Sequence, residues 1–181
     1  PTARPQPSSN GRWDEAERLN EASTAIKRGL PAAAFGPNLI NRARIAAGRG
    51  EHATAVTAFE AALASPDTPA WVQWQAHAGL ASVFMSGGRT DRALPHFDRA
   101  LAIVESTRSS LLRPEYRISF LSRMIHFHRA YVEALMRSGQ PLRALEVADG
   151  SRARVLAERF GQAPAARMRA AAIASRLART G

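Results

Sequence analysis

The sequence predicts an all-α fold built from consecutive helix–turn–helix pairs. Alanine is abundant, and it is the best helix former because it loses no side-chain entropy on becoming helical. A pattern of Gly, Ala, Phe and Ala recurs at fixed spacing, and most prolines fall between the segments with helical periodicity. With 45% hydrophobic and 22% charged residues, the composition is globular, and the length suits one domain or a short repeat array.

The recurring pattern is clearest in segments 48–65 (GRGEHATAVTAFEAALAS) and 86–103 (SGGRTDRALPHFDRALAI). In both, an Ala follows the turn glycine, a Phe comes one helical turn later, and a second Ala follows that Phe. The aligned positions are Gly50, Ala55, Phe59 and Ala62 in the first segment, and Gly88, Ala93, Phe97 and Ala100 in the second. Further copies are the one with Gly139, Ala144, Ala148 and Ser151, and a partial one with Gly11, Trp13 and Ala16.

Each position of the pattern has a physical reason. The Gly ends the first helix of a pair (helix A) in a left-handed C-cap conformation. The Ala positions on the second helix (helix B) let two helices approach closely, while the Phe fills the gap between pairs. The basic unit is about 34 residues long with insertions, and the largest insertion lies between Ala93 and Ala144.

This arrangement resembles the tetratricopeptide repeat, in which a Gly closes helix A and an Ala, an aromatic residue and an Ala follow on helix B. The resemblance covers roughly 11–160 and implies repeats stacked into a right-handed superhelix. The chain departs from the family pattern on helix A. The family's Trp position holds Leu39, His77 and His128, and its small-residue position holds Ala43, Ala81 and Val132.

The repeat spacing and the helix-breaking prolines and glycines define the expected helices. The expected helices are 12–28, 37–48, 52–65, 69–86, 90–107, 114–138 and 141–160, with an additional tail helix over 164–178 as an option. Pro95 falls inside one of them, where we expect a mild distortion. The domain organisation that follows is a disordered lead-in over 1–10, a helical repeat array over 11–160, and a helical tail or linker over 161–181.

A closer resemblance lies in the last pair. The phrase RALEVADGSRARVL, which contains Ala144 to Leu156, looks like the last repeat before the caspase-like domain of bacterial CHAT proteins. Segment 108–123 also resembles the Arg-rich connection that those proteins place before this pair. The resemblance implies a longer gene in which a His and Cys dyad follows on a downstream domain. Asp149 and Gly150 depart from the family's phrase.

Composition excludes several classes of site. The chain has no cysteine, so it holds no disulfide, no thiolate metal site and no Cys nucleophile. No apolar window is long enough to cross a bilayer, and no signal peptide is recognisable. The net charge of +10 is carried almost wholly by arginine, since Lys27 is the sole lysine. The arginines are interleaved with Glu and Asp and lack an aromatic stacking platform, which argues against nucleic acid as the partner.

Candidate catalytic and metal-binding residues have structural explanations. No two histidines have the spacing of three or four residues that places ligands on one helix face, although a site assembled from separate helices stays open. Acidic residues near 14–17 favour the positive end of a helix dipole. Phosphate-loop and nucleophile-elbow motifs are absent. We therefore predict no catalytic residue, no cofactor and no metal.

Large apolar side chains are assigned to the core. Trp71 and Trp74 lie three residues apart and are interpreted as packing between repeats, with ligand stacking as the alternative. The methionines Met124, Met136 and Met168 are likewise interpreted as packing.

The predicted binding surface is the concave face lined by helix A. The residues that we expect there are Asn41, Arg44, Gln75, Ser82, Met85, His126, Arg129, Glu133 and Arg137. A cluster of Arg44, Arg129 and Arg137 would favour an acidic segment or a C-terminal carboxylate, because guanidinium pairs bidentately with carboxylate. The alternative is that these arginines solvate a helix face.

Arg152, Arg154 and the basic tail after them are expected to dock the downstream domain, with a frayed linker as the alternative. These patterns favour a cytoplasmic protein-interaction scaffold, the partner-binding region of a larger CHAT-type protease. The other readings are a free-standing adaptor and a basic nucleic-acid-binding helical domain. The partner is expected to be a protein or peptide, without membrane contact.

Overall fold

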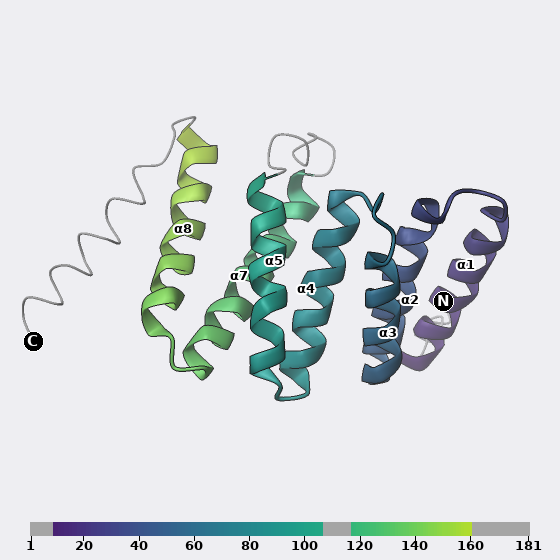
Figure 1. The fold of residues 1–181 in the computed structure, drawn as a ribbon, viewed down its shortest axis with the longest axis horizontal. Coiled ribbons are helices and arrows are strands. Elements are labelled where there is room, and N and C mark those ends of the chain that lie inside the picture. The colour runs from purple at the N-terminus through teal and green to yellow at the C-terminus, as the bar shows by residue number, and fades with distance from the viewer. Residues whose placement is uncertain (1–8, 107–116, 161–181) are drawn as a thin grey trace, which may run out of the picture. The chain divides into compact units, whose positions relative to one another are not determined.

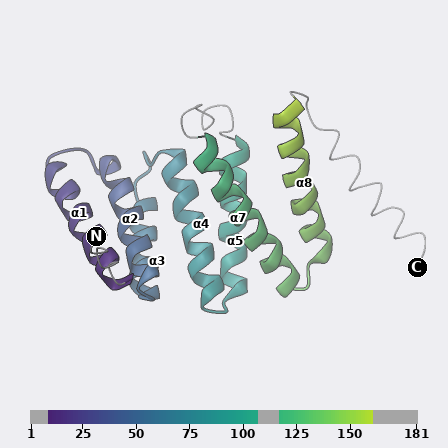
Figure 2. The ribbon, with the colours of Figure 1, turned by 180° about the vertical axis from the view of Figure 1, so that it is seen from behind.

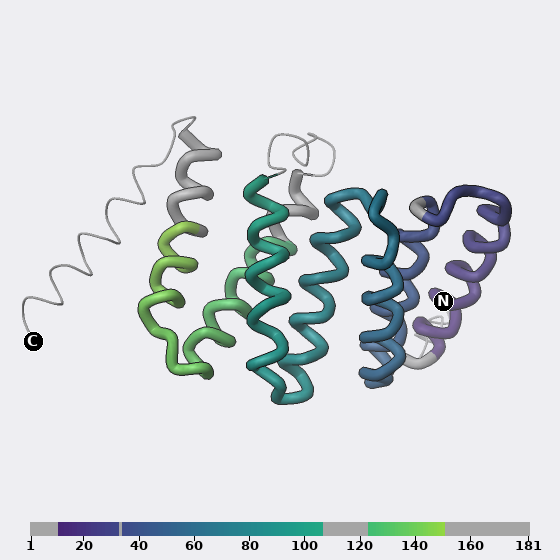
Figure 3. The backbone as a smooth tube through the Cα atoms, in the orientation of Figure 1, coloured from purple at the N-terminus to yellow at the C-terminus, as the bar shows by residue number. Residues whose placement is uncertain are grey.

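A computed structural model describes residues 9–106 and 117–160, with side chains over 11–32, 34–106 and 123–150. Every regular element in these ranges is a helix, which confirms the all-α prediction (Figures 1 and 3). The elements are α1 (Ser9–Ile26), the 3₁₀ helix η1 (Ala32–Phe35), α2 (Gly36–Gly48), α3 (His52–Leu63), α4 (Ala70–Ser86), α5 (Thr90–Ser106), α7 (Arg117–Arg137) and α8 (Pro141–Phe160).

The predicted helix boundaries agree with the structure to within three residues. The N-terminal boundary differs, because α1 begins at Ser9 and so takes in two residues of the expected lead-in. Gly11 consequently lies inside a helix, unlike the repeat glycines Gly50, Gly88 and Gly139, which form turns. Helix α5 runs through Pro95 without a break. The expected tail helix over 164–178 lies outside the described residues.

Three glycine turns share one geometry. Gly50, Gly88 and Gly139 have φ of +80°, +70° and +73°, the left-handed conformation predicted for them. In each turn the residue after the glycine donates its N–H to a carbonyl five residues earlier, as Arg89 does to Phe84 O at 2.8 Å. The glycine donates to the carbonyl three residues earlier, as Gly88 does to Met85 O at 3.0 Å. This pair of bonds is the Schellman motif, so the turn is closed by backbone alone.

The described helices fall into two compact units, 1–111 and 112–181. In the first unit, α2 packs on α3, α4 packs on α5, and α3 and α2 both contact α4 (Figure 1). Its core contains the repeat positions Ala55, Phe59, Ala62, Ala93, Phe97 and Ala100, all of them buried. Phe59 of α3 lies against Gly79 of α4, where an added Cβ would come within 2.2 Å of the ring. The prediction that Phe fills the gap between pairs is confirmed there.

Helix α1 joins the first unit through a polar seam. It lies beside α2, on the side away from α3 (Figure 2). Asn20 donates to Asn38 O at 3.0 Å, and Lys27 Nζ donates to Asn38 Oδ1 at 2.6 Å. The larger aliphatic side chains of α1 point to solvent, with Leu19 59% and Ile26 85% exposed. The Trp13 ring nevertheless lies against Gly48 of α2, so the seam also contains an apolar contact.

The second unit packs α7 on α8. Among the side chains that the structure describes in this unit, the large buried ones lie on α7, and they include Tyr131, Phe127 and Leu135. Helix α8 contributes Ala144, which is buried as predicted. Arg143 of α8 donates through Nη2 to the Tyr131 hydroxyl at 3.0 Å, which ties the two helices together.

Candidate binding surface

The helix A residues predicted in the first unit lie at its surface. Asn41 and Arg44 are exposed on α2, and Ser82 is exposed on α4, while Gln75 and Met85 are half-buried. Residues three, four or seven apart share a helix face, so the set forms one stripe on α2 and one on α4. Because α2 packs against α4, these two stripes belong to neighbouring helices.

The second unit carries a stripe of its own. His126, Arg129, Glu133 and Arg137 are exposed along one face of α7. Arg137 Nη1 lies 3.6 Å from Glu133 Oε1, with both side chains more than half exposed. An exposed pair of this kind stabilises a helix by only about 0.2–0.5 kcal/mol, so a ligand carboxylate can compete for Arg137.

Two predicted groupings stay predictions. Arg44 belongs to the first unit, whereas Arg129 and Arg137 belong to the second, so their clustering is untested. Arg152 and Arg154 lie on α8, but their side chains are outside the described residues. Their role in docking a further domain is likewise untested.

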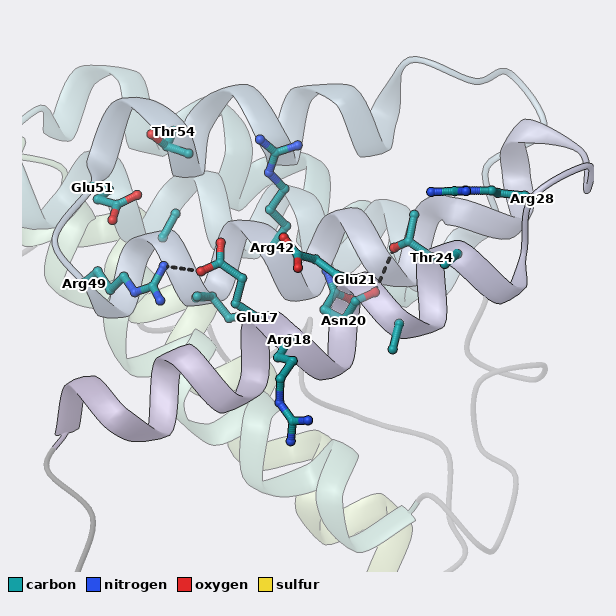
Figure 4. A pocket seen from close by; sticks show the side chains of 14 residues that line it. Glu17, Arg18, Asn20, Glu21, Thr24, Arg28, Arg42, Arg49, Glu51 and Thr54 are labelled. Carbon is teal, nitrogen blue, oxygen red and sulfur yellow. Dashed lines mark hydrogen bonds and ion pairs between the residues drawn. The ribbon is translucent and has the colours of Figure 1, made fainter.

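A cleft of about 830 Å³ opens between α1 and α3, with α2 as its floor (Figure 4). It shares no residue with the predicted surface. Ile45 and Ala46 form an apolar floor, and charged groups of both signs surround it. The charged residues that line it are Glu17, Arg18, Glu21, Arg28, Arg42, Arg49 and Glu51.

Arg49 closes one end of the cleft. It donates to Glu17 Oε2 at 2.7 Å and also binds Asp14, and these bonds raise the pKa of its guanidinium. Arg28 and Arg42 are exposed and have no carboxylate partner within the described part of the chain. The cleft therefore offers free cations beside carboxylates, a lining that suits polar groups of mixed charge. Its position depends on how α1 meets α2, which no sequence pattern reveals.

A histidine pair spans α4 and α5. His77 Nδ1 and His96 Nδ1 lie 3.0 Å apart, and both side chains are half-buried. Burial, followed by the charges of His96 and Arg99, lowers the pKa of His77 to about 4. Burial also lowers the pKa of His96, although the charge of Glu60 opposes the shift. Sequence spacing missed the pair, but the two residues lie at similar distances from the glycine turn and so meet across the helix pair.

The His96 ring is held in place by Phe84. The two rings stack with centroids 5.5 Å apart and planes 27° apart. Arg89 and Arg92 place their guanidinium carbons 4.9 Å from the centre of the Phe84 ring, within cation–π distance. This packing leaves the imidazole little freedom to change rotamer.

Not all of the large apolar side chains assigned to the core are buried. Trp74 is 5% exposed, as predicted, but Trp71 is 42% exposed, so the assignment of Trp71 was wrong. Met124 is buried, whereas Met136 is 57% exposed and was also misassigned. Both side chains lie on helix faces that are exposed within the described part of the chain. Met168 lies outside the described residues.

Membrane-spanning helices and clusters of three or more metal ligands are both absent from the described residues. None of the helices there is long and apolar enough to cross a bilayer. Within the same residues, no group of three or more His, Asp or Glu side chains is arranged around a common metal position.

The helix pair α4/α5 is also the part of the chain that a family model matches. Residues 76–110 match the tetratricopeptide repeat. The matched span includes most of α4, the glycine turn and the whole of α5. No curated protein and no solved structure matches the chain. The fold is thus all-α with tetratricopeptide-type helix pairs, an architecture whose exposed helix A faces generally bind proteins or peptides.

Proposed function

We propose that this chain is a protein-interaction scaffold that binds peptide segments on its exposed helix A stripes. The observation that carries the proposal is the tetratricopeptide match over α4/α5, together with polar and charged side chains exposed on α2, α4 and α7. Solenoids of this type use such faces to hold extended ligands. No catalytic centre or cofactor is part of the proposal.

The proposed ligand is an acidic segment or a free C-terminal carboxylate. Arg44 and Arg129 are exposed on helix A faces, and guanidinium groups pair with carboxylates through two parallel hydrogen bonds. The net charge of +10 adds a long-range attraction for acidic partners. The competing explanation, that these arginines only solvate their helices, predicts no loss of binding when they are removed.

A double substitution tests this proposal. We expect Arg44→Ala combined with Arg129→Ala to raise the Kd for a labelled Glu-rich octapeptide with a free carboxylate by about tenfold, which is about 1.4 kcal/mol. Fluorescence anisotropy at two salt concentrations measures the change.

The matched control is Arg12→Ala combined with Arg18→Ala, which removes the same charge from α1. We expect the control to change the Kd by less than about twofold at 0.15 M salt, where separated surface charges are largely screened. Equal losses in the two double variants would mean that the peptide senses net charge alone, and the helix A assignment would then be wrong.

The larger context that we propose is the partner-binding region of a bacterial, cytoplasmic CHAT-type protein. The support for it is the phrase from Ala144 to Leu156, with Arg152 and Arg154 as the expected contacts to a caspase-like domain of the same gene. Any peptidase activity would then belong to that domain. A coding sequence with a His and a Cys after Gly181 supports this context, and a stop codon there leaves a free-standing adaptor.

A nucleic-acid-binding role is the second candidate, favoured only by the net charge of +10. Titration of random oligonucleotides at several salt concentrations separates the two functions. Contacts with several phosphates give a steep fall of affinity with salt, and a shallow dependence with weak binding rejects the role.

A further inference from the structure

The Nδ1 atoms of His77 and His96 face each other at hydrogen-bond distance, so a proton or another cation must lie between them. They are 3.0 Å apart, and the ring centroids are 5.3 Å apart, so each nitrogen lies near the line that joins the rings. Two imidazole lone pairs repel each other in this arrangement. One imidazole must therefore donate an N–H to the other, or a cation must take the place of that proton.

We propose that His77 and His96 form a two-imidazole site for a divalent transition-metal ion such as Zn²⁺ or Cu²⁺. Imidazole nitrogen is a preferred ligand of both ions. Two nitrogens bound at about 2.0–2.1 Å to a tetrahedral ion lie about 3.3 Å apart, so the pair must open by a few tenths of an ångström. Each ring must also tilt by about 35°, so that its lone pair points to the ion and no longer along the line between the two nitrogens.

A metal ion can replace the proton between the two Nδ1 atoms without any further reactant, because that proton moves to another nitrogen of the same ring. The donor imidazole moves its proton from Nδ1 to Nε2, and both rings then present a lone pair on Nδ1 while staying neutral.

Neighbouring side chains restrict the His96 ring and set the electrostatic contribution to the metal affinity of the pair. The stack on Phe84 restricts the His96 ring, so the tilt that metal binding needs must be made within that contact. Glu60 acts favourably on a positive charge at this place, whereas Arg92 and Arg99 act against it. With only two protein ligands, water or a side chain from a bound partner would complete the coordination.

Calorimetric titration of the whole chain with ZnSO₄ at pH 7.5 tests the site. We expect one zinc ion per chain, with binding weakened at least about tenfold in both His77→Gln and His96→Gln. The matched control is His126→Gln, which removes an exposed histidine from α7 and should leave the affinity within about twofold. Far-UV circular dichroism checks that each variant is folded.

Glu60→Gln and Arg99→Gln sharpen the test, because they change the charge near the pair without removing a ligand. The first should weaken zinc binding and the second should strengthen it. Absence of saturable binding by the unmodified chain would overturn the proposal. Equal affinity in the His77→Gln variant, or an equal loss in His126→Gln, would do the same and would leave the pair as a hydrogen bond between neutral rings.

Discussion

The helix pairs α4/α5 and α7/α8 share a turn but fill their cores in different ways. In α4/α5, both helices supply large side chains, with Phe84 from helix A and Phe97 from helix B. In α7/α8, the position equivalent to Phe97 is Ala148, and the large buried side chains that the structure describes there, Tyr131 and its neighbours, lie on α7. The turn hydrogen bonds are nevertheless the same in both pairs.

This difference separates two kinds of constraint. The turn requires a glycine with positive φ, and its bonds are made by backbone atoms, so its geometry does not depend on the residues of the core. The core requires a filled volume, and either helix can supply it. Close contact between successive pairs is the added constraint in the first unit, where Phe59 lies against Gly79.

The largest expected effect comes from the helix B aromatic. Phe97→Ala should lower the free energy of unfolding of the first unit by about 3–5 kcal/mol, because a buried ring leaves a cavity. At the equivalent place in the second unit, Ala148→Gly should cost only about 1 kcal/mol, the helix propensity difference. Urea unfolding followed by circular dichroism measures both, and equal losses would show that the two cores do not differ.

The contact between pairs gives the next effect. Gly79→Ala should destabilise the first unit by about 1–3 kcal/mol, because the new methyl group would come within 2.2 Å of the buried Phe59 ring. Gly87→Ala is the matched control in the same unit. Gly87 has φ of −84° and no neighbour closer than 3.5 Å to an added Cβ, so that variant should be neutral or slightly more stable. Thermal unfolding of the two variants, measured in parallel, tests this difference in stability.

The turns should respond alike in both units. Gly88→Ala and Gly139→Ala should each cost about 1–2 kcal/mol, since both residues have positive φ and nothing lies near an added Cβ. A cost that differs by more than about 1 kcal/mol between them would break the idea that the turn is independent of its core. Chemical denaturation at one temperature suffices for the comparison.

The smallest expected effect is a pH dependence confined to the first unit. His77 is neutral in the folded state, with a pKa of about 4 against 6.5 when unfolded, so the unfolded chain binds more protons between these values. Stability is full above pH 6.5 and falls as the pH drops toward 4, by about 1 kcal/mol after allowance for solvent screening. His77→Gln should flatten the pH profile of unfolding over this range, and an unchanged profile in that variant would contradict the prediction.

Local features were predictable from the sequence, whereas features that depend on distances between helices were not. The glycine turns and the buried Ala and Phe positions follow from spacing alone, because the repeat frame fixes their place. Trp71 and Met136 were misassigned because apolar character does not show whether a neighbouring helix covers a face. The His77–His96 contact and the cleft beside α1 arise from the approach of two helices, which is set by the packing of many other residues.

The seam between α1 and α2 gives the N-terminal helix a sensitivity to ionic strength. Arg49 binds Asp14 and Glu17 across the seam; the Asp14 side chain is largely exposed and the Glu17 side chain about half exposed. Dissolved salt screens exposed charges but barely affects buried apolar contacts such as Phe59 against Gly79. We therefore expect concentrated salt to weaken the ion pairs at this end of the cleft, while the apolar contact of Trp13 with Gly48 is barely affected.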